Sequence, residues 1–430
     1  MSKQRHLPKI FISHSAHNEV DKQFMNTLVN RLENAGYKLY CDQKRLKVGS
    51  HWRNELYTAI GCCNAAIILI TKEALDVLAH PWVFHECSML TIINWADKDF
   101  PIFPITMNGV TISDIEKSPF GALRISDKQI VSFNNIDEII EKITTQLCDL
   151  SCSEENEPLF YHYKRIGSRL AAVNSQLIKN AIEQVDSELT RWDPMNRELQ
   201  YNLAILLLSL TSSEIIDVLQ EILPSLGESD TKKLLYFIAP FWLDLPTVAS
   251  LENMLQIDQL EIQKKSGSKN QNYQKLRKAF CLNASRQDTG RMHASRAGFL
   301  RKQPYRVIDF PYNDAGTDDE NRYASHIIAR MRTSLLDSDA IVEEFAIKYA
   351  LDHPTFIIIP YGVDKDIILN LRKRFWSFIF MVLIGNDDPT DWSDSQFMIL
   401  EPLLESGKED KVYYQLNEAI NLATTIINGY

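Results

Sequence analysis

Short apolar runs alternate with longer stretches of mixed polarity over the first 150 residues. Each run is four to six residues long and apolar almost throughout, which is typical of strands buried on both faces. The runs are KIFIS (9–13), YKLYC (37–41), AAIILI (65–70) and FPIT (103–106). Between them, apolar residues recur at spacings of three and four, as at Phe24, Leu28 and Leu32, and predict amphipathic helices. This alternation predicts a parallel sheet covered by helices on both faces.

Glycine and proline mark where two of these helices end and begin. Gly36 follows the helix that carries Leu32 and is expected to end it. Pro81 stands where a first-turn proline belongs and is expected to open a helix running through Cys87 to Ile93. Another helix is expected from Trp52 to Cys63, with the adjacent pair Cys62 and Cys63 inside the core.

Two polar stretches, 151–158 and 264–272, divide the rest of the chain. The part between them has a helical period, with a leucine-rich face over 199–210, and predicts a module of four to six helices. Residues 266–430 alternate again and predict a second α/β domain. Its expected strands are 279–284, 305–310 and 355–360, and its expected helices are 292–302, 323–336 and 341–351, with a polar loop over 285–290. The predicted domains are therefore 1–150, 151–265 and 266–430.

The composition is that of a globular protein with an acidic excess. The 46 basic and 56 acidic residues give a net charge of −10, which argues against a broad basic surface for direct nucleic-acid binding. The longest apolar stretches, 203–208 and 375–384, are too short to span a membrane. Seven irregularly spaced cysteines without a CxxC pair suggest neither a disulfide framework nor a zinc site. We expect a cytoplasmic protein without a metal.

The first domain resembles a TIR (Toll/interleukin-1 receptor) domain. Three segments carry the resemblance: KIFISHS (9–15), LYCDQKRLKVGSHW (39–52) and TKEALDVLAHPWVFHE (71–86). TIR domains have an opening F-x-S-[YH] strand, then a strand ending in Asp before the BB loop with its Leu and Gly, and later a helix that begins W-x-x-x-E. The resemblance implies a flavodoxin-like fold for residues 8–148.

Within this family, the segment Trp82 to Glu86 is similar to the W-V-x-x-E of the members that cleave NAD⁺. The two residues are four positions apart, so they share one face of a helix. Nicotinamide leaves the cationic pyridinium as a neutral group, so no general acid is needed. One carboxylate can hold the ribose hydroxyls and stabilise the oxocarbenium-like charge. The resemblance assigns this catalytic role to Glu86, with NAD⁺ as substrate and no separate cofactor.

Each candidate also has a plainer interpretation. Glu86 could be a solvated helix residue, Trp82 a core aromatic and Asp42 a turn cap, while His14 and His85 could be structural or solvent-facing. The substrate-binding candidates that the resemblance supplies are Trp82, Phe11, His14, Ser15, Asp42, Leu46, Gly49 and Trp52. Asp42, Leu46 and Gly49 match the BB-loop pattern, and in enzymatic TIR assemblies that loop packs on a neighbouring TIR. The resemblance therefore implies a homo-oligomer through TIR–TIR contacts.

The segment 279–302 reads as strand, polar loop and helix, which is the architecture of a P-loop. It lacks GxxxxGK[ST], because Arg291 and Met292 follow Gly290 where Lys and Ser or Thr belong. It loosely resembles a degenerate STAND-type NTPase module, as found beside TIR domains in bacterial immune proteins. A Rossmann-like sensor of a nucleotide messenger and an unrelated scaffold are the alternatives.

These features lead to one function hypothesis and two alternatives. The first is an NAD⁺ glycohydrolase that releases nicotinamide and ADP-ribose or a cyclic isomer, activated by oligomerisation in bacterial anti-phage immunity. Its expected partners are other copies of the chain and an activating protein or nucleotide signal. The alternatives are a non-catalytic TIR adaptor and a TIR inhibitor that a pathogen secretes.

Overall fold

The computed structural model describes most of the chain in two compact units. Unit 1 comprises residues 1–241, 300–302 and 419–430, and unit 2 comprises 242–299 and 303–418. The described residues are 7–15, 18–41, 52–77, 80–97, 99–128, 130–132, 136–148, 150, 157–185, 197–243, 245–266, 279–300, 305–310, 319–335, 343–393, 396–405 and 407–428. Among them, no single helix is long and apolar enough to cross a membrane, although two helices joined by a bend pass the test together by length and composition.

Unit 1 begins with a five-stranded parallel sheet in the order β2-β1-β3-β4-β5. Its strands are β1 (Lys9–Ser13), β2 (Lys38–Cys41), β3 (Ala65–Ile70), β4 (Ile102–Thr106) and β5 (Val131–Ser132). Every residue of β1, β3 and β4 is buried, because helices cover both faces of the sheet. The predicted parallel sheet is confirmed.

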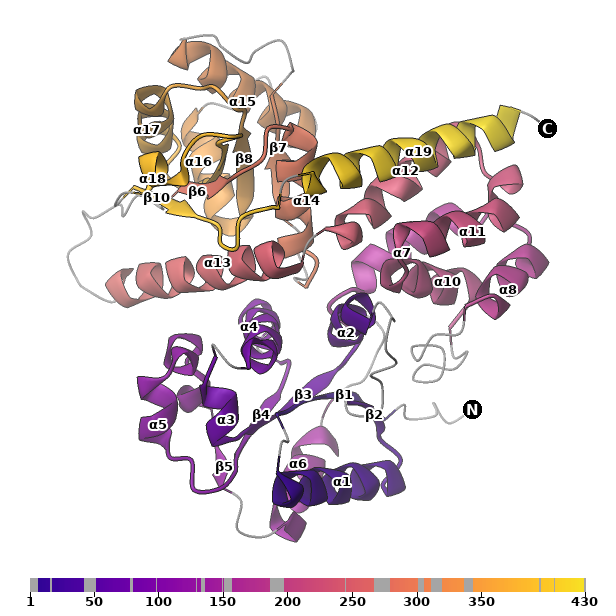
Figure 1. The fold of residues 1–430 in the computed structure, drawn as a ribbon, viewed down its shortest axis with the longest axis vertical. Helices are drawn as coiled ribbons and strands as arrows, with labels where there is room; N and C mark the ends of the chain where they lie inside the picture. The colour runs from indigo at the N-terminus through magenta and orange to yellow at the C-terminus, as the bar shows by residue number, and fades with distance from the viewer. Residues whose placement is uncertain are drawn as a thin grey trace. The chain divides into compact units, whose positions relative to one another are not determined.

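The helices divide between the two faces of this sheet. They are α1 (Glu19–Asn34), α2 (Trp52–Gly61), α3 (Lys72–Leu75), α4 (Pro81–Ala96), α5 (Ile112–Lys117) and α6 (Ile136–Cys148). Figure 1 shows α1 and α6 on one face and α2 and α4 on the other. Ile10 and Ile12 point to the α1 and α6 side, where they share a core with Leu28 and Ile143. Gly36 follows α1 with φ +90°, a conformation that favours glycine, as the sequence predicts.

A helical part follows in unit 1. Its helices are α7 (Phe160–Leu170), α8 (Ser175–Glu183), α10 (Leu199–Ser209), α11 (Ser212–Ile222) and α12 (Glu228–Ile238). Residues 203–209 of α10 are all buried, so this helix is surrounded by its neighbours, which include α7 and α8. Helix α8 also contacts α11. Thr211 and Glu214 form a capping box that starts α11.

The amino-terminal edge of the first sheet is tied to the helical part by a buried ion cluster. Glu157 accepts hydrogen bonds from Lys9 Nζ and Arg197 Nη2 on one oxygen, and the Tyr163 hydroxyl donates to the other at 3.1 Å. Lys9 is the first residue of β1, which places this cluster at the opposite end of the strand from Ser13. The sheet and the helices are thus held together by buried charge.

Unit 2 contains a second five-stranded parallel sheet in the order β10-β6-β9-β8-β7. Its strands are β6 (Ala279–Leu282), β7 (Arg306–Ile308), β8 (Thr355–Ile359), β9 (Ile379–Leu383) and β10 (Phe397–Ile399). Its helices are α13 (Leu245–Ser266), α14 (Gln287–Ala297), α15 (Glu320–Leu335), α16 (Glu343–Asp352), α17 (Lys365–Arg374), α18 (Pro389–Trp392) and α19 (Lys408–Asn428), the last of which continues into unit 1. The predicted second α/β domain is confirmed.

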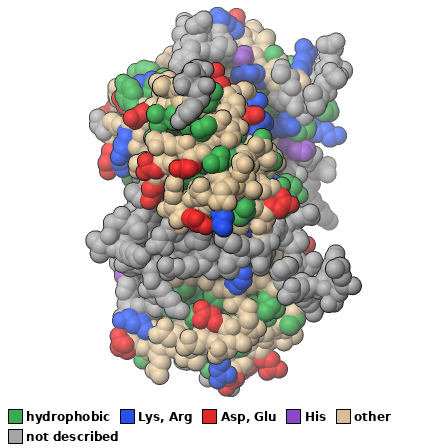
Figure 2. All heavy atoms as spheres, turned by 90° about the vertical axis from the view of Figure 1, so that its right-hand side faces the viewer, with side chains coloured by type: hydrophobic (Ala, Val, Ile, Leu, Met, Phe, Trp, Pro, Cys, Tyr) green, Lys and Arg blue, Asp and Glu red, His purple; other side chains and the backbone are tan. Residues whose placement is uncertain are grey.

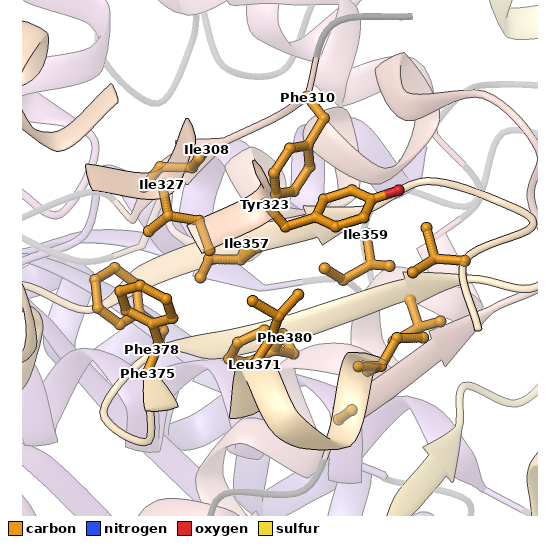
Figure 3. Close-up of a cluster of buried hydrophobic side chains, with 14 of the residues drawn as sticks. Ile308, Phe310, Tyr323, Ile327, Ile357, Ile359, Leu371, Phe375, Phe378 and Phe380 are labelled. Carbon is orange, nitrogen blue, oxygen red and sulfur yellow. The ribbon is translucent and has the colours of Figure 1, made fainter. Parts of the chain in front are cut away.

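Alternate residues of these strands face two separate cores. One side packs against α15, α16 and α17 through an aromatic-rich cluster that includes Phe310, Tyr323, Phe375 and Phe380 (Figure 3). The other side packs against α13 and α14, which contribute residues such as Leu251 and Ala294.

One helix boundary in unit 2 differs from the prediction. The sequence predicts a polar loop over 285–290 and a helix over 292–302, whereas α14 runs from Gln287 to Ala297. The prediction is wrong because Gln287, Asp288 and Thr289 look like loop residues by composition, yet they form the first turn of α14, where the Glu409 carboxylate accepts from the Arg286 backbone N–H and the Thr289 hydroxyl.

Charged side chains of both signs share the surface. On the face drawn in Figure 2, Lys and Arg side chains lie among Asp and Glu side chains. The described part of that face therefore carries a mixture of charge rather than a field of one sign.

Candidate active site of the N-terminal domain

The order of the first sheet reverses between β1 and β3. From β1 the chain moves outward to β2 and then returns to β3 on the other side of β1. In open parallel sheets, ligands bind in the crevice outside the carboxyl ends of the strands at such a switch point. The residues that follow the two strands here are His14 and Ser15 after β1 and Thr71 after β3.

Thr71 joins the two loops at this crevice. Its side chain accepts a hydrogen bond from the backbone N–H of Ala74 at 3.1 Å, so it caps α3. Its hydroxyl lies 3.4 Å from the carbonyl oxygen of Ser15, to which it donates. Ser15 is itself buried, and its own hydroxyl has no hydrogen-bond partner within the described part of the chain.

Helix α4 carries Glu86 and packs against the same sheet. Pro81 is its first residue, as predicted, and the helix contacts both β1 and β4. Glu86 is only 5% exposed, whereas Trp82, one turn earlier, is partly exposed. The Trp82 ring meets the His85 ring edge-on, with 5.8 Å between ring centroids.

Cys87, the residue that follows Glu86 on α4, is fully buried. Burial raises the pKa of the Cys87 thiol well above its ordinary value, and the negative charge of Glu86 raises it further. The nearby hydroxyl of Ser13, the last residue of β1, acts on this pKa in the opposite direction. The Cys87 thiol therefore stays protonated at neutral pH.

His85 is uncharged near neutral pH. Burial lowers the pKa of its imidazole from the ordinary value. Within the described residues its Nδ1 atom is buried without a hydrogen-bond partner.

The structure places several of the residues expected from the sequence. Glu86 and Trp82 lie on α4, which contacts β1, and His14 and Ser15 directly follow β1. Phe11 instead lies inside the domain, where its fully buried ring stacks on Tyr40 with 5.5 Å between centroids. Trp52 begins α2. Asp42, Leu46 and Gly49 lie outside the described residues.

Two residues of the crevice, Ser13 and Thr71, were not among the candidates from the sequence. Both are small hydroxyl residues at the carboxyl end of a buried strand, and that position is the signal that could have found them. In the described residues, no group of three His, Cys, Asp or Glu side chains is arranged to hold a metal ion.

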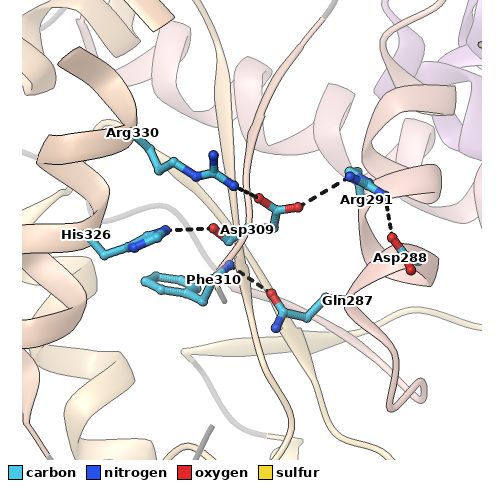
Figure 4. Close-up of polar contacts among 7 residues, drawn as sticks. All are labelled: Gln287, Asp288, Arg291, Asp309, Phe310, His326 and Arg330. Atoms are coloured by element: carbon cyan, nitrogen blue, oxygen red, sulfur yellow. Dashed lines mark hydrogen bonds and ion pairs between the residues drawn. The ribbon is translucent and has the colours of Figure 1, made fainter. Parts of the chain in front are cut away.

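The second sheet carries a polar cluster at the carboxyl end of β7 (Figure 4). Asp309 accepts from Arg330 at 2.9 Å and lies 3.5 Å from Arg291, while His326 bonds its carbonyl oxygen at 2.9 Å. Arg291 also pairs with Asp288 in the first turn of α14. Carboxylates thus engage both guanidinium groups, and the cluster ties α14 and α15 to the end of β7.

Comparison with known proteins identifies the first domain. Residues 10–147 match the family model described as TIR domain, so the N-terminal region of this chain is a TIR domain. The same region is similar to the probable 2' cyclic ADP-D-ribose synthase TcpO of Methanobrevibacter olleyae, with 26% identity over 140 residues. The alignment covers 32% of this chain and 39% of that protein.

Proposed function

We propose that the TIR domain cleaves the nicotinamide–ribose bond of NAD⁺, with Glu86 as the catalytic carboxylate. The observation that carries the proposal is the burial of Glu86, a carboxylate that is only 5% exposed on α4, a helix that contacts β1, one of the two strands that flank the switch point of the sheet. The similarity to a protein named as a cyclic ADP-ribose synthase supports the same chemistry.

The local chemistry suits a carboxylate that stabilises a cation. Water is largely excluded around Glu86, so its charge acts more strongly on a developing ribosyl cation than it would in bulk solvent. The Cys87 thiol is protonated and cannot compete as a nucleophile. The unpartnered hydroxyl of Ser15 is suited to a ribose hydroxyl, and the partly exposed Trp82 ring to the nicotinamide.

Two products follow from the same cation. Attack by water gives ADP-ribose, whereas attack by a hydroxyl of the same molecule gives a cyclic isomer. The name of the relative favours a cyclic product for this chain.

Activity is expected to depend on association of TIR domains. The resemblance places the BB loop, with Asp42, Leu46 and Gly49, against a neighbouring TIR, which would complete the site. The helical part and the second α/β domain would then restrain or promote clustering in response to a protein or nucleotide signal. We assign the whole chain to antiviral defence, in which NAD⁺ loss stops an infected cell.

The test is NAD⁺ loss by the purified full chain over a range of concentrations, with products separated by chromatography. Glu86→Gln should reduce cleavage about 100- to 1000-fold, the usual effect of removing one electrostatic stabiliser. Glu116→Gln, an exposed glutamate on α5, is the matched control and should leave the rate unchanged.

Two results would contradict the proposal. Cleavage that persists in Glu86→Gln would exclude this residue as the catalytic group. No cleavage at any concentration, also with crowding agents, would favour the non-catalytic adaptor. For the defence role, cells carrying Glu86→Gln should lose protection against phage that the unaltered chain provides.

A further inference from the structure

A single threonine hydroxyl joins the two loops that follow β1 and β3. Thr71 is the first residue after β3 and is only 1% exposed. A hydroxyl has one proton to donate and lone pairs that accept, and Thr71 uses both. It donates to the carbonyl oxygen of Ser15 at 3.4 Å and accepts from the backbone N–H of Ala74 at 3.1 Å. Bulk water offers no replacement for either bond, because all three residues are buried.

Thr71 stands at the end of a firmly paired strand. All six residues of β3 are buried, and the strand lies between β1 and β4. The carbonyl oxygen of Ile70 accepts from the backbone N–H of Met107 at 2.9 Å, so pairing with the chain of β4 continues to the residue before Thr71. Thr71 therefore gives the loop after β1 a fixed point of attachment.

The residue that Thr71 holds carries an unused hydrogen-bonding group. Within the residues that the structure describes, the Ser15 hydroxyl is buried and has no hydrogen-bond partner. Burying a hydroxyl in this way costs free energy, and the cost is recovered when a bound molecule supplies the partner. Ser15 follows one of the two strands that flank the switch point, which is where ligands of open parallel sheets bind.

The end of β1 faces the helix that carries Glu86. Side chains alternate between the two faces of a strand, and Ile10 and Ile12 point to the α1 and α6 side. Ser13, the last residue of β1, therefore points to the opposite face, which α4 covers. Helix α4 also contacts β1 directly. The loop that Thr71 fastens thus begins on the side of the sheet that carries the proposed catalytic carboxylate.

We propose that Thr71 is a positioning residue for NAD⁺ cleavage, which presents the Ser15 hydroxyl to a ribose hydroxyl of the substrate by holding the Ser15 carbonyl. This inference rests on the function proposed above. Thr71 has both of its hydrogen bonds within the protein, so it acts through Ser15. Without the Thr71 hydroxyl, the Ser15 carbonyl loses a buried donor and the loop after β1 is no longer fastened to β3.

Steady-state NAD⁺ cleavage by the full chain, with kcat and KM measured separately, tests the role. Thr71→Val replaces the hydroxyl by a methyl group of similar size and should lower kcat/KM about tenfold, because the Ser15 hydroxyl is no longer held in place. Thr71→Ser keeps the hydroxyl and should stay within about threefold of the unaltered chain. Thr111→Val is the matched control: it removes the cap of α5 in the same domain and should leave kcat/KM unchanged.

Removal of the Ser15 hydroxyl separates positioning from stability. Because this hydroxyl has no partner in the described part of the chain, Ser15→Ala should not lower Tm. It should raise KM and lower kcat/KM about tenfold, since a ribose hydroxyl loses its partner. In the Ser15→Ala background, Thr71→Val should lower kcat/KM by less than about twofold more, because both changes remove one interaction.

Several results would overturn the inference. These are an unchanged kcat/KM in Thr71→Val, an equal loss in Thr111→Val, or a full second loss when Thr71→Val is added to Ser15→Ala. If Thr71→Val does not fold, Thr71→Ala takes its place, and failure of both to fold would assign Thr71 to stability alone. Cleavage that requires Glu86 but not Thr71 would remove this inference and leave the proposed function standing. No cleavage by the unaltered chain would remove both.

Discussion

Replacement of Glu157 by glutamine probes the strongest electrostatic contact in unit 1. Glu157 is 3% exposed, and the side chains of its partners Arg197 and Lys9 are only 2% and 11% exposed. Glutamine has nearly the same shape but no charge. The substitution therefore removes a negative charge that both buried cations contact.

The expected loss follows from this geometry. Removing one partner from a buried ion pair costs about 3–5 kcal/mol, because the remaining charge is left uncompensated. The neighbouring Lys38 already has a lowered pKa, caused first by burial and then by the charges of Lys9 and Arg197. Loss of the carboxylate charge of Glu157, which contacts both cations, raises that positive potential. We expect the free energy of unfolding to fall by about 3–5 kcal/mol and Tm by about 10 °C.

Urea denaturation and thermal unfolding of the full chain measure the effect. Glu138→Gln is the control, since Glu138 and Lys142 form an ion pair whose side chains are 57% and 46% exposed, and it should cost less than about 0.5 kcal/mol. Adding Lys9→Met to Glu157→Gln should recover part of the lost free energy of unfolding, because it removes one of the two buried positive charges. A loss below about 1 kcal/mol, or no recovery in the double variant, would refute the reasoning.

Two further perturbations test packing and burial. Burial raises the pKa of Glu252 to about 8, with Arg296 opposing the shift. Between pH 4.5 and 8 the unfolded chain has released the Glu252 proton and the folded chain holds it, so the free energy of unfolding should fall as pH rises through this window. Denaturation measured at pH 5, 6.5 and 8 should show this fall, and Glu252→Gln should make it smaller. In α2, an added Cβ at Gly61 would lie 2.3 Å from the buried Leu159 side chain, so Gly61→Ala should cost about 1–3 kcal/mol. Gly227→Ala, where a Cβ meets open space, should change stability by less than about 0.5 kcal/mol, and equal losses at both positions would exclude the steric explanation.

Part of the candidate site could be predicted because its signals are local. Pro81 defines the start of α4, and the four-residue spacing places Trp82 and Glu86 one turn apart whatever surrounds the helix. Thr71 and Ser13 escaped prediction, because a hydroxyl residue after a strand is common. Only the hydrogen bond from the Thr71 hydroxyl to the Ser15 carbonyl shows that the loops after β1 and β3 meet.

The sequence by itself determined the elements that depend on short-range periodicity. Runs of buried apolar residues produced β1, β3, β4 and β8 close to their expected bounds, because a strand enclosed on both faces must be apolar along its whole length. Tertiary structure alone decided what depends on partners far along the chain. It placed β10 beside β6 and joined Lys9 to Glu157. It also started α14 at Gln287, where the Thr289 hydroxyl donates to the carboxylate of Glu409, 120 residues further along the chain. A helix cap or an ion pair joins two residues that are close in space, and no local sequence pattern predicts which distant residue will be the second partner.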